Sequence, residues 1–79
     1  MKIYDFNGQK NVCRKKVREE RLKRNMKQKE LAAQMHLRGV VLDDTAISKI
    51  ESGDRFVTDY EVKVLADIFG ITTDELLGN

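Results

Sequence analysis

The second half of the chain contains the same helix-start signal twice. Thr58-Asp59-Tyr60-Glu61 and Thr72-Thr73-Asp74-Glu75 each place a threonine three residues before a glutamate. In such a capping box, the two side chains satisfy backbone N–H groups that the first turn of a helix leaves unpaired. Gly70, between the boxes, is the residue type that most often ends a helix. These signals predict a helix from residue 58 to Gly70 and a last helical turn through Leu77.

An equally sharp pair of signals brackets residues 44–52. Asp43 is a good N-cap, and Gly53 supplies the C-terminal stop. Leu42 and Ile47 stand where a hydrophobic staple requires apolar residues. Helical periodicity gathers the apolar residues of this segment on one face. The opposite, polar face consists of Thr45, Ser48, Lys49 and Ser52. The sequence predicts a short helix that packs with one face and presents the other outward.

Two further helices are predicted in the first half. Inward-facing residues recur every four positions from Cys13 to Arg21, which indicates a helix from Asn11, as its N-cap, to about residue 24, with Asn25 as its stop. The next helix is predicted for residues 28–35.

The segments around these two helices are less regular. Lys27 is a poor cap for the helix that follows it. Residues 36–43 are predicted as a loop centred on Gly39, with its valines and leucine packing partly on the core. In residues 1–10, apolar side chains at Ile3 and Phe6 and the Asn7-Gly8 turn signal indicate an extended arm or a short strand.

The composition favours helices throughout. Proline is absent and aromatic residues make up 6% of the chain, so helix breakers and typical strand residues are scarce. With 79 residues, 41% hydrophobic and 35% charged, the chain suits one folded domain. We therefore predict an all-α, compact five-helix domain over residues 12–79, preceded by a short extended N-terminal arm over residues 1–11.

The residue types argue against several classes of function. Cys13 is the single cysteine and is interpreted as a small core residue. The sequence contains no signal peptide and no apolar run long enough to span a bilayer, which predicts a cytoplasmic protein without membrane contact. His36, interpreted as a loop residue, has no histidine or cysteine near it to complete a metal site. Ser48 has no supporting base for nucleophilic chemistry. No enzyme, metal or cofactor is predicted.

The net charge of +2 conceals an asymmetry. Residues 1–38 contain 12 Lys or Arg against 4 Asp or Glu, and residues 39–79 contain 3 against 9. Such a division suits a polyanionic partner, although a basic helix face also serves solubility. The basic run on the first helix is interpreted as a solvated face.

Glu51 is placed where it needs a cation. It lies four residues after Ile47, at the edge of the buried face of the third helix, where an unpaired carboxylate is costly. Arg21, on the inward stripe of the first helix, can hold a carboxylate through two parallel hydrogen bonds. The sequence predicts an Arg21–Glu51 ion pair.

These residues together carry a family resemblance. They are Val17-x-x-x-Arg21, Gln28-x-x-Leu31-Ala32, Ile47-Ser48-x-Ile50-Glu51-x-Gly53-x-Arg55, Leu65-Ala66 and Asp74-x-Leu76-Leu77. Over about residues 12–78 the chain resembles the Cro and lambda-repressor-like, or Xre-type, helix-turn-helix domain. The resemblance implies a five-helix fold in which the second and third helices form the helix-turn-helix and the third enters the major groove.

The resemblance also implies contacts with DNA, position by position. The base-reading positions correspond to Asp44, Thr45 and Lys49, with Ala46 able to touch a thymine methyl group. The backbone-contacting positions, at the start of the second helix and around the third, are Lys27, Gln28, Ser48, Ser52 and Arg55. The implied protein is a transcriptional regulator of prokaryotic or phage type, a repressor that binds a double-stranded DNA operator. Two half-sites imply a homodimer, at least on DNA.

Two departures from the family pattern leave alternatives open. The segment between Ala32 and Ile47 is about five residues longer than the usual turn of the family. The pair Asp43-Asp44 brings negative charge to the DNA-facing tip, where a carboxylate is costly unless it caps the helix or accepts from a cytosine amine. Asp43 is interpreted as the cap, and both alternatives stay open for Asp44. An antitoxin-like module, whose helical surface binds a protein partner, is the alternative function.

Overall fold

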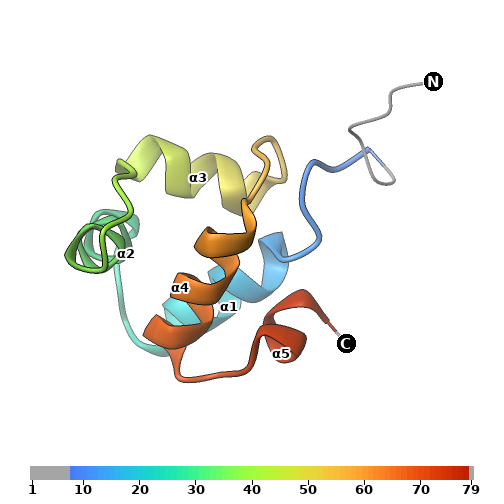
Figure 1. The fold of residues 1–79 in the computed structure, drawn as a ribbon. Coiled ribbons are helices and arrows are strands. Elements are labelled where there is room, and N and C mark those ends of the chain that lie inside the picture. Colours follow the sequence, from blue (N-terminus) through green and yellow to red (C-terminus); the bar gives the residue numbers. More distant parts are fainter. Residues whose placement is uncertain (1–7, 79) are drawn as a thin grey trace.

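The computed structural model describes residues 8–78, whose regular elements are all helices (Figure 1). They are α1 (Arg14–Lys23), α2 (Gln28–Leu37), α3 (Asp44–Ser52), α4 (Asp59–Phe69) and α5 (Thr73–Leu77). This arrangement confirms the predicted fold class. The strand or arm predicted around Ile3 and Phe6 falls on residues 1–7, which lie outside the described part.

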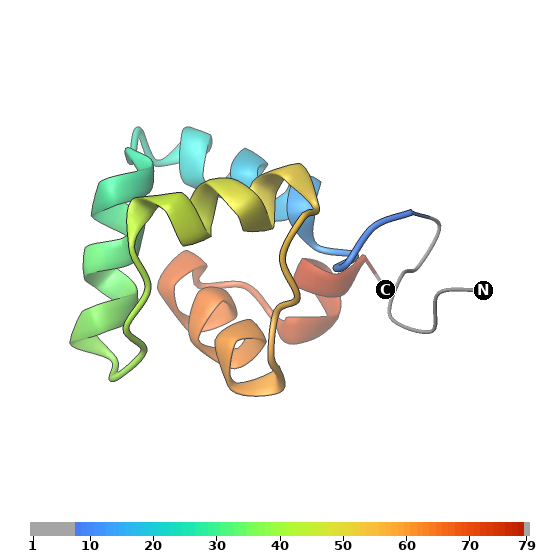
Figure 2. The same cartoon turned by 90° about the horizontal axis from the view of Figure 1, so that it is seen from above.

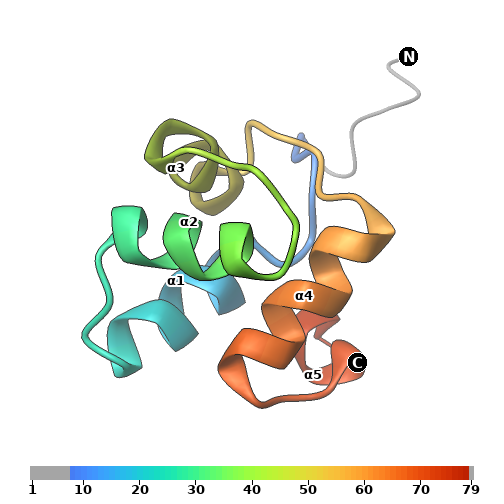
Figure 3. The ribbon, with the colours of Figure 1, turned by 60° about the vertical axis from the view of Figure 1, so that its left-hand side comes forward.

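Helix α3 lies along one side of the molecule (Figures 1 and 2). It packs on α2 and on α1, while α4 lies on the far side of the core and contacts α1, α2 and α5. Seen from the side in Figure 3, α2 and α3 lie next to each other, and α5 closes the end of the molecule beneath α4. One face of α3 is thereby left uncovered.

The predicted helix caps are present where the signals are strongest. Thr58 Oγ1 accepts a hydrogen bond from the Glu61 N–H at 3.3 Å, and Glu61 Oε1 accepts from the Thr58 N–H at 2.9 Å. The Thr72 box closes in the same way with Glu75. Asp43 Oδ1 accepts from an amide of the first turn of α3 at 2.8 Å. Local sequence alone therefore sets the starts of α3, α4 and α5.

Two predicted helix boundaries were wrong. Helix α1 begins at Arg14, not after Asn11, because the Asn11 side chain donates to distant carbonyl groups instead of capping the helix. Helix α2 continues to Leu37, two residues past the predicted end, so His36 lies on its last turn and not in a loop. The last inward-facing apolar residue was taken for the helix end, but the chain reverses only at Gly39, which has a φ of 87°.

The core is formed by side chains from all five helices and the loops between them. Its buried members include at least one residue of every helix, and Cys13, at 1% exposure, is confirmed as a core residue. In the loop before α3, Val40 is buried and Leu42 packs against the core, but Val41 is 77% exposed. Within residues 8–78, no helix is long and apolar enough to span a bilayer.

Candidate nucleic-acid interface

Helix α3 has one buried and one exposed face. Ile47 and Ile50 are completely buried, whereas the four polar residues predicted to face outward are all exposed. Asp44 and Thr45 are exposed on the first turn, and Ala46 between the faces is half-buried. The side chains of Asp44, Thr45, Ser48 and Lys49 make no hydrogen bond or ion pair within the part of the chain that the structure describes. They are available to an external partner.

The predicted ion pair between Arg21 and Glu51 lies on the side of α3 that packs against the protein. Arg21 Nε donates to Glu51 Oε2 at 2.6 Å and Arg21 Nη2 donates to Glu51 Oε1 at 2.9 Å, so the contact is bidentate. Arg21 Nη1 also donates to the Met26 carbonyl at 2.7 Å. The hydrogen bonds that Arg21 donates to Glu51 raise the pKa of Arg21 above its already high usual value. The pair therefore ties α3 to α1 and to the turn before α2.

A polar cleft opens between α1, α2 and α3 next to this pair. Gln28 at the start of α2 extends into it and donates to Glu51 Oε1 at 3.3 Å. The residues that line the cleft are Arg18, Arg21, Gln28, Ser48, Glu51 and Ser52. The structure thus brings together residues from three helices that include several of the predicted backbone contacts.

Arg18 is a residue of this cleft that the sequence analysis missed. It was counted with the solvated basic face of α1, yet it is exposed beside the predicted backbone contacts. Its position three residues before Arg21, on the adjacent part of the α1 surface, was the available signal. Arg18 adds a cation that has no acidic partner within the described residues.

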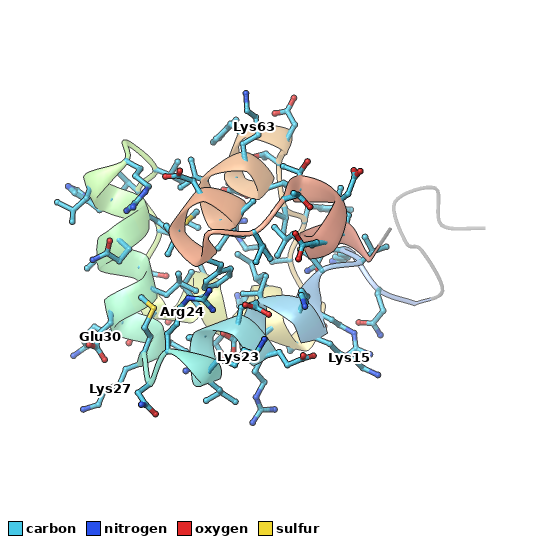
Figure 4. All side chains as sticks on the ribbon, turned by 90° about the horizontal axis from the view of Figure 1, so that it is seen from below. Lys15, Lys23, Arg24, Lys27, Glu30 and Lys63 are labelled. Atoms are coloured by element: carbon cyan, nitrogen blue, oxygen red, sulfur yellow. The ribbon has the colours of Figure 1, made fainter. Side chains whose placement is uncertain are left out.

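The rest of the basic run on α1 is largely engaged within the protein. The Glu20 carboxylate, 2% exposed, lies 2.8 Å from Arg24 and 3.2 Å from both Lys16 and Lys23. These contacts, with the Arg24 hydrogen bond the strongest, lower the pKa of Glu20 to about 2. In Figure 4, which views the side away from α3, Arg24 turns inward, where it also donates to the Phe69 carbonyl. Part of the positive charge of α1 is therefore structural.

Like Gln28, the predicted backbone contacts Arg55 and Ser52 have partners inside the protein. Arg55 donates to both carboxylate oxygens of Glu61, at 3.0 and 3.2 Å, and its side chain is 29% exposed. Burial disfavours the charged form of Glu61, but the hydrogen bonds from Arg55 and Thr58 outweigh it and lower the pKa. Ser52 Oγ lies within hydrogen-bond distance of the Lys49 carbonyl and of Asp54. Arg55 is thus less available than a surface arginine.

The remaining predicted contact, Lys27, is exposed as the N-cap of α2. Glu30 Oε1 accepts a hydrogen bond from the Lys27 backbone N–H at 2.8 Å, so this end of α2 carries a carboxylate near its amides. Figure 4 shows the Lys27 side chain extending away from the body of the molecule. Among the described residues, no group of histidine, cysteine and acidic side chains could hold a metal ion.

A comparison with protein families decides what this surface belongs to. A family model described as helix-turn-helix, of the Cro and Xre-like type, matches residues 17–76. The chain belongs to this helix-turn-helix family. Searches of curated proteins and of solved structures gave no match. In the family fold, α2 and α3 are the helix-turn-helix pair, and the chain is a DNA-binding domain of the kind found in transcriptional regulators.

Proposed function

We propose that the protein is a sequence-specific repressor of prokaryotic or phage type, which binds a double-stranded DNA operator and blocks polymerase. One observation carries the proposal: the polar face of α3 is exposed while its opposite face is fixed by buried isoleucines and the Arg21–Glu51 pair. A helix held rigidly from behind can hold its side chains in register with base edges in a major groove. A DNA target also suits the cytoplasm, where prokaryotic DNA lies.

The exposed residues on the first two turns of α3 are the proposed base readers. Lys49 can donate to guanine O6 or N7, and Thr45 can donate to or accept from a base edge. Ala46, half-buried, offers a methyl group to thymine. Asp44, exposed beside the Asp43 cap, can accept from a cytosine amine. These four side chains would set the sequence preference.

The proposed backbone contacts flank these base readers. Gln28 lies at the positive end of the α2 dipole, and Ser48 and Ser52 line the same cleft, which suits a phosphate group. Arg18 lines the cleft, and Lys27 adds exposed positive charge at the start of α2. We assign Arg55 a weaker contact, since both of its terminal nitrogens donate to Glu61.

A single recognition helix reads only a few base pairs, so we propose that the protein binds as a homodimer on two half-sites about 34 Å apart. The core residue Phe69, 2% exposed, is unsuitable for such a contact, and Ile71 and Leu77 pack against the core. Val12, which lines a surface hollow together with Val57, and Tyr60, on the first turn of α4, are both more than half exposed. This apolar surface, beyond the C-terminal end of α3, is our proposed dimer contact.

A protein partner remains the second candidate because of two other exposed side chains. Leu37 and Val41, at the end of α2 and in the long connection to α3, are 75% and 77% exposed. Apolar side chains exposed to this degree suit an antitoxin-like contact with another protein. This contact would depend little on salt, whereas phosphate contacts weaken steeply as salt rises.

The test begins with selection of bound duplexes from a random DNA pool. Fluorescence anisotropy then follows the affinity for the selected site as salt is raised, with an expected slope of about −0.9 per phosphate contact. Binding without sequence preference, or affinity insensitive to salt, would contradict the proposal.

Three variants assign the roles of individual residues. Lys49→Ala should relax specificity at one base position by about 1–3 kcal/mol, while Gln28→Ala should weaken binding to all sequences alike. Lys63→Ala is the matched control, because this exposed lysine lies on α4, remote from α1 (Figure 4). Its removal should leave the base preference unchanged. Equal, sequence-independent losses for Lys49→Ala and Gln28→Ala would contradict the assignment.

A further inference from the structure

The residues just before α1 lie against the C-terminal end of the recognition helix. The Lys10 N–H donates to the Gly53 carbonyl at 2.9 Å, and the Lys10 ammonium lies 5.7 Å from the centre of the Phe56 ring. Residues 9–11, which we call the N-terminal strap, precede the segment that the family model matches. The strap therefore lies outside the part of the chain that the family model matches.

Asn11 makes the central contacts of the strap. Its amide nitrogen donates to the Ile50 carbonyl at 3.0 Å and to the Arg55 carbonyl at 2.9 Å, 39 and 44 residues away in the sequence. Its oxygen lies 3.7 Å from the Cys13 sulfur, which orients the amide group. The Ile50 carbonyl belongs to the last turn of α3 and also accepts a hydrogen bond from the Gly53 N–H at 3.1 Å, where the helix ends. One side chain thus joins the end of α3 to the loop that leads to α4.

Gly53 provides the space that the strap needs. It ends α3 with a φ of 86°, and a Cβ atom at this position would lie 1.8 Å from Gln9 Oε1. A residue with a side chain would therefore both strain the backbone and push Gln9 away. The Lys10 backbone and the Gln9 side chain of the strap thus both contact the turn at Gly53.

We infer that Asn11 is a positioning residue for DNA binding, which acts by fixing the end of α3 and the adjoining loop. The expected effect on DNA binding rests on the proposed function. Ser52 is the last residue of α3, and Arg55 lies in the loop that follows. These two of the proposed backbone contacts therefore belong to the segment from Ile50 to Arg55, whose two ends Asn11 joins. A nine-residue helix has little stability of its own, and its last turn depends on such tertiary contacts.

The first measurement concerns the free protein and does not involve DNA. Asn11→Ala removes both donors, and Asn11→Asp removes them while keeping the size and the oxygen near Cys13. In both variants we expect the amide protons of Lys10, Gly53 and Asp54 to exchange at least about tenfold faster, corresponding to about 1.4 kcal/mol of lost local stability. Unchanged exchange at all three amides would overturn the inference.

Thr72→Ala is the matched control, since it removes the two hydrogen bonds of the Thr72 hydroxyl group with Glu75 at the start of α5, at a distance from α3. We expect it to leave exchange at Lys10, Gly53 and Asp54 unchanged. Gln9→Ala is a milder variant that removes only the side chain resting on Gly53, and it should shift exchange in the same direction by a smaller factor.

The second measurement is DNA binding by the same variants, at a temperature where circular dichroism shows each one folded. Asn11→Ala should bind the selected site about tenfold more weakly, with a salt slope shallower by about 0.9, the loss of one phosphate contact. Its base preference should be retained, and Thr72→Ala should bind as the wild type does. Wild-type affinity and slope for Asn11→Ala would overturn this inference alone. A wild-type protein that binds no DNA would overturn the proposed function as well.

Discussion

Replacing Arg21 by methionine removes the cation that pairs with Glu51 and keeps a side chain of similar length. The Arg21 and Glu51 side chains are 10% and 6% exposed, so the variant leaves a nearly buried carboxylate with only the Gln28 amide near it. Removing one partner of a buried pair costs about 3–5 kcal/mol. A domain of this size is stable by about 4–12 kcal/mol, so the change should remove a large part of the stability.

The assay is urea unfolding followed by circular dichroism. With an m-value of about 1 kcal/mol per molar urea, the Arg21→Met midpoint should fall by about 3 M, or the variant should be unfolded without urea. The double variant Arg21→Met/Glu51→Met, which buries no charge, should recover at least about 2 kcal/mol relative to Arg21→Met.

Arg38→Met is the matched control for this experiment. Arg38 Nε lies 2.9 Å from Asp67, but the two side chains are 34% and 71% exposed. An exposed pair contributes at most about 1 kcal/mol, so its loss should shift the midpoint by less than about 1 M. Equal shifts for Arg21→Met and Arg38→Met, or a double variant no more stable than Arg21→Met, would refute the reasoning.

Three further predictions follow from other parts of the structure. Because the folded-state pKa of Glu20, about 2, lies below the ordinary 4.5, its ionised form stabilises the fold above pH 4.5, and this contribution is lost as pH falls toward 2. Glu20→Gln should therefore be less stable than wild type at pH 7 and nearly equal to it at pH 2, as followed by thermal unfolding; a constant difference would argue against the Glu20 cluster. Gly53→Ala should destabilise the protein more than Gly70→Ala in urea, since both positions have positive φ but only Gly53 faces another side chain; equal losses would contradict the packing of Gln9. Burial raises the pKa of Cys13 to about 11, so a thiol reagent at pH 8 should label it slowly in the native protein and rapidly in urea.

The sequence predicts most reliably the features that neighbouring residues determine. The start of α3 at Asp43 and the capping boxes of α4 and α5 depend on side chains three residues apart, so they follow from local pattern. The Arg21–Glu51 pair, 30 residues apart, was also predictable, because a carboxylate on a buried face requires a cation on the inward stripe of another helix.

What the sequence did not indicate depends on distant partners. Asn11 is of a residue type that commonly caps helices, but its hydrogen bonds go to Ile50 and Arg55, which only the folded chain brings near. Arg55 follows the family pattern of a backbone contact, yet both of its terminal nitrogens donate to Glu61. Arg18 lies in the candidate interface only because α2 and α3 pack beside its part of α1. Each case requires tertiary geometry that local pattern does not contain.

The central claim is that the exposed face of α3 contacts base edges in the major groove. Methylation interference on the selected operator tests it directly, because dimethyl sulfate modifies guanine N7 in the major groove and adenine N3 in the minor groove. Methylation of guanines within each half-site should prevent binding, and for Lys49→Ala interference should disappear at one guanine per half-site. Interference confined to adenine N3, or a pattern that Lys49→Ala leaves unchanged, would contradict the account.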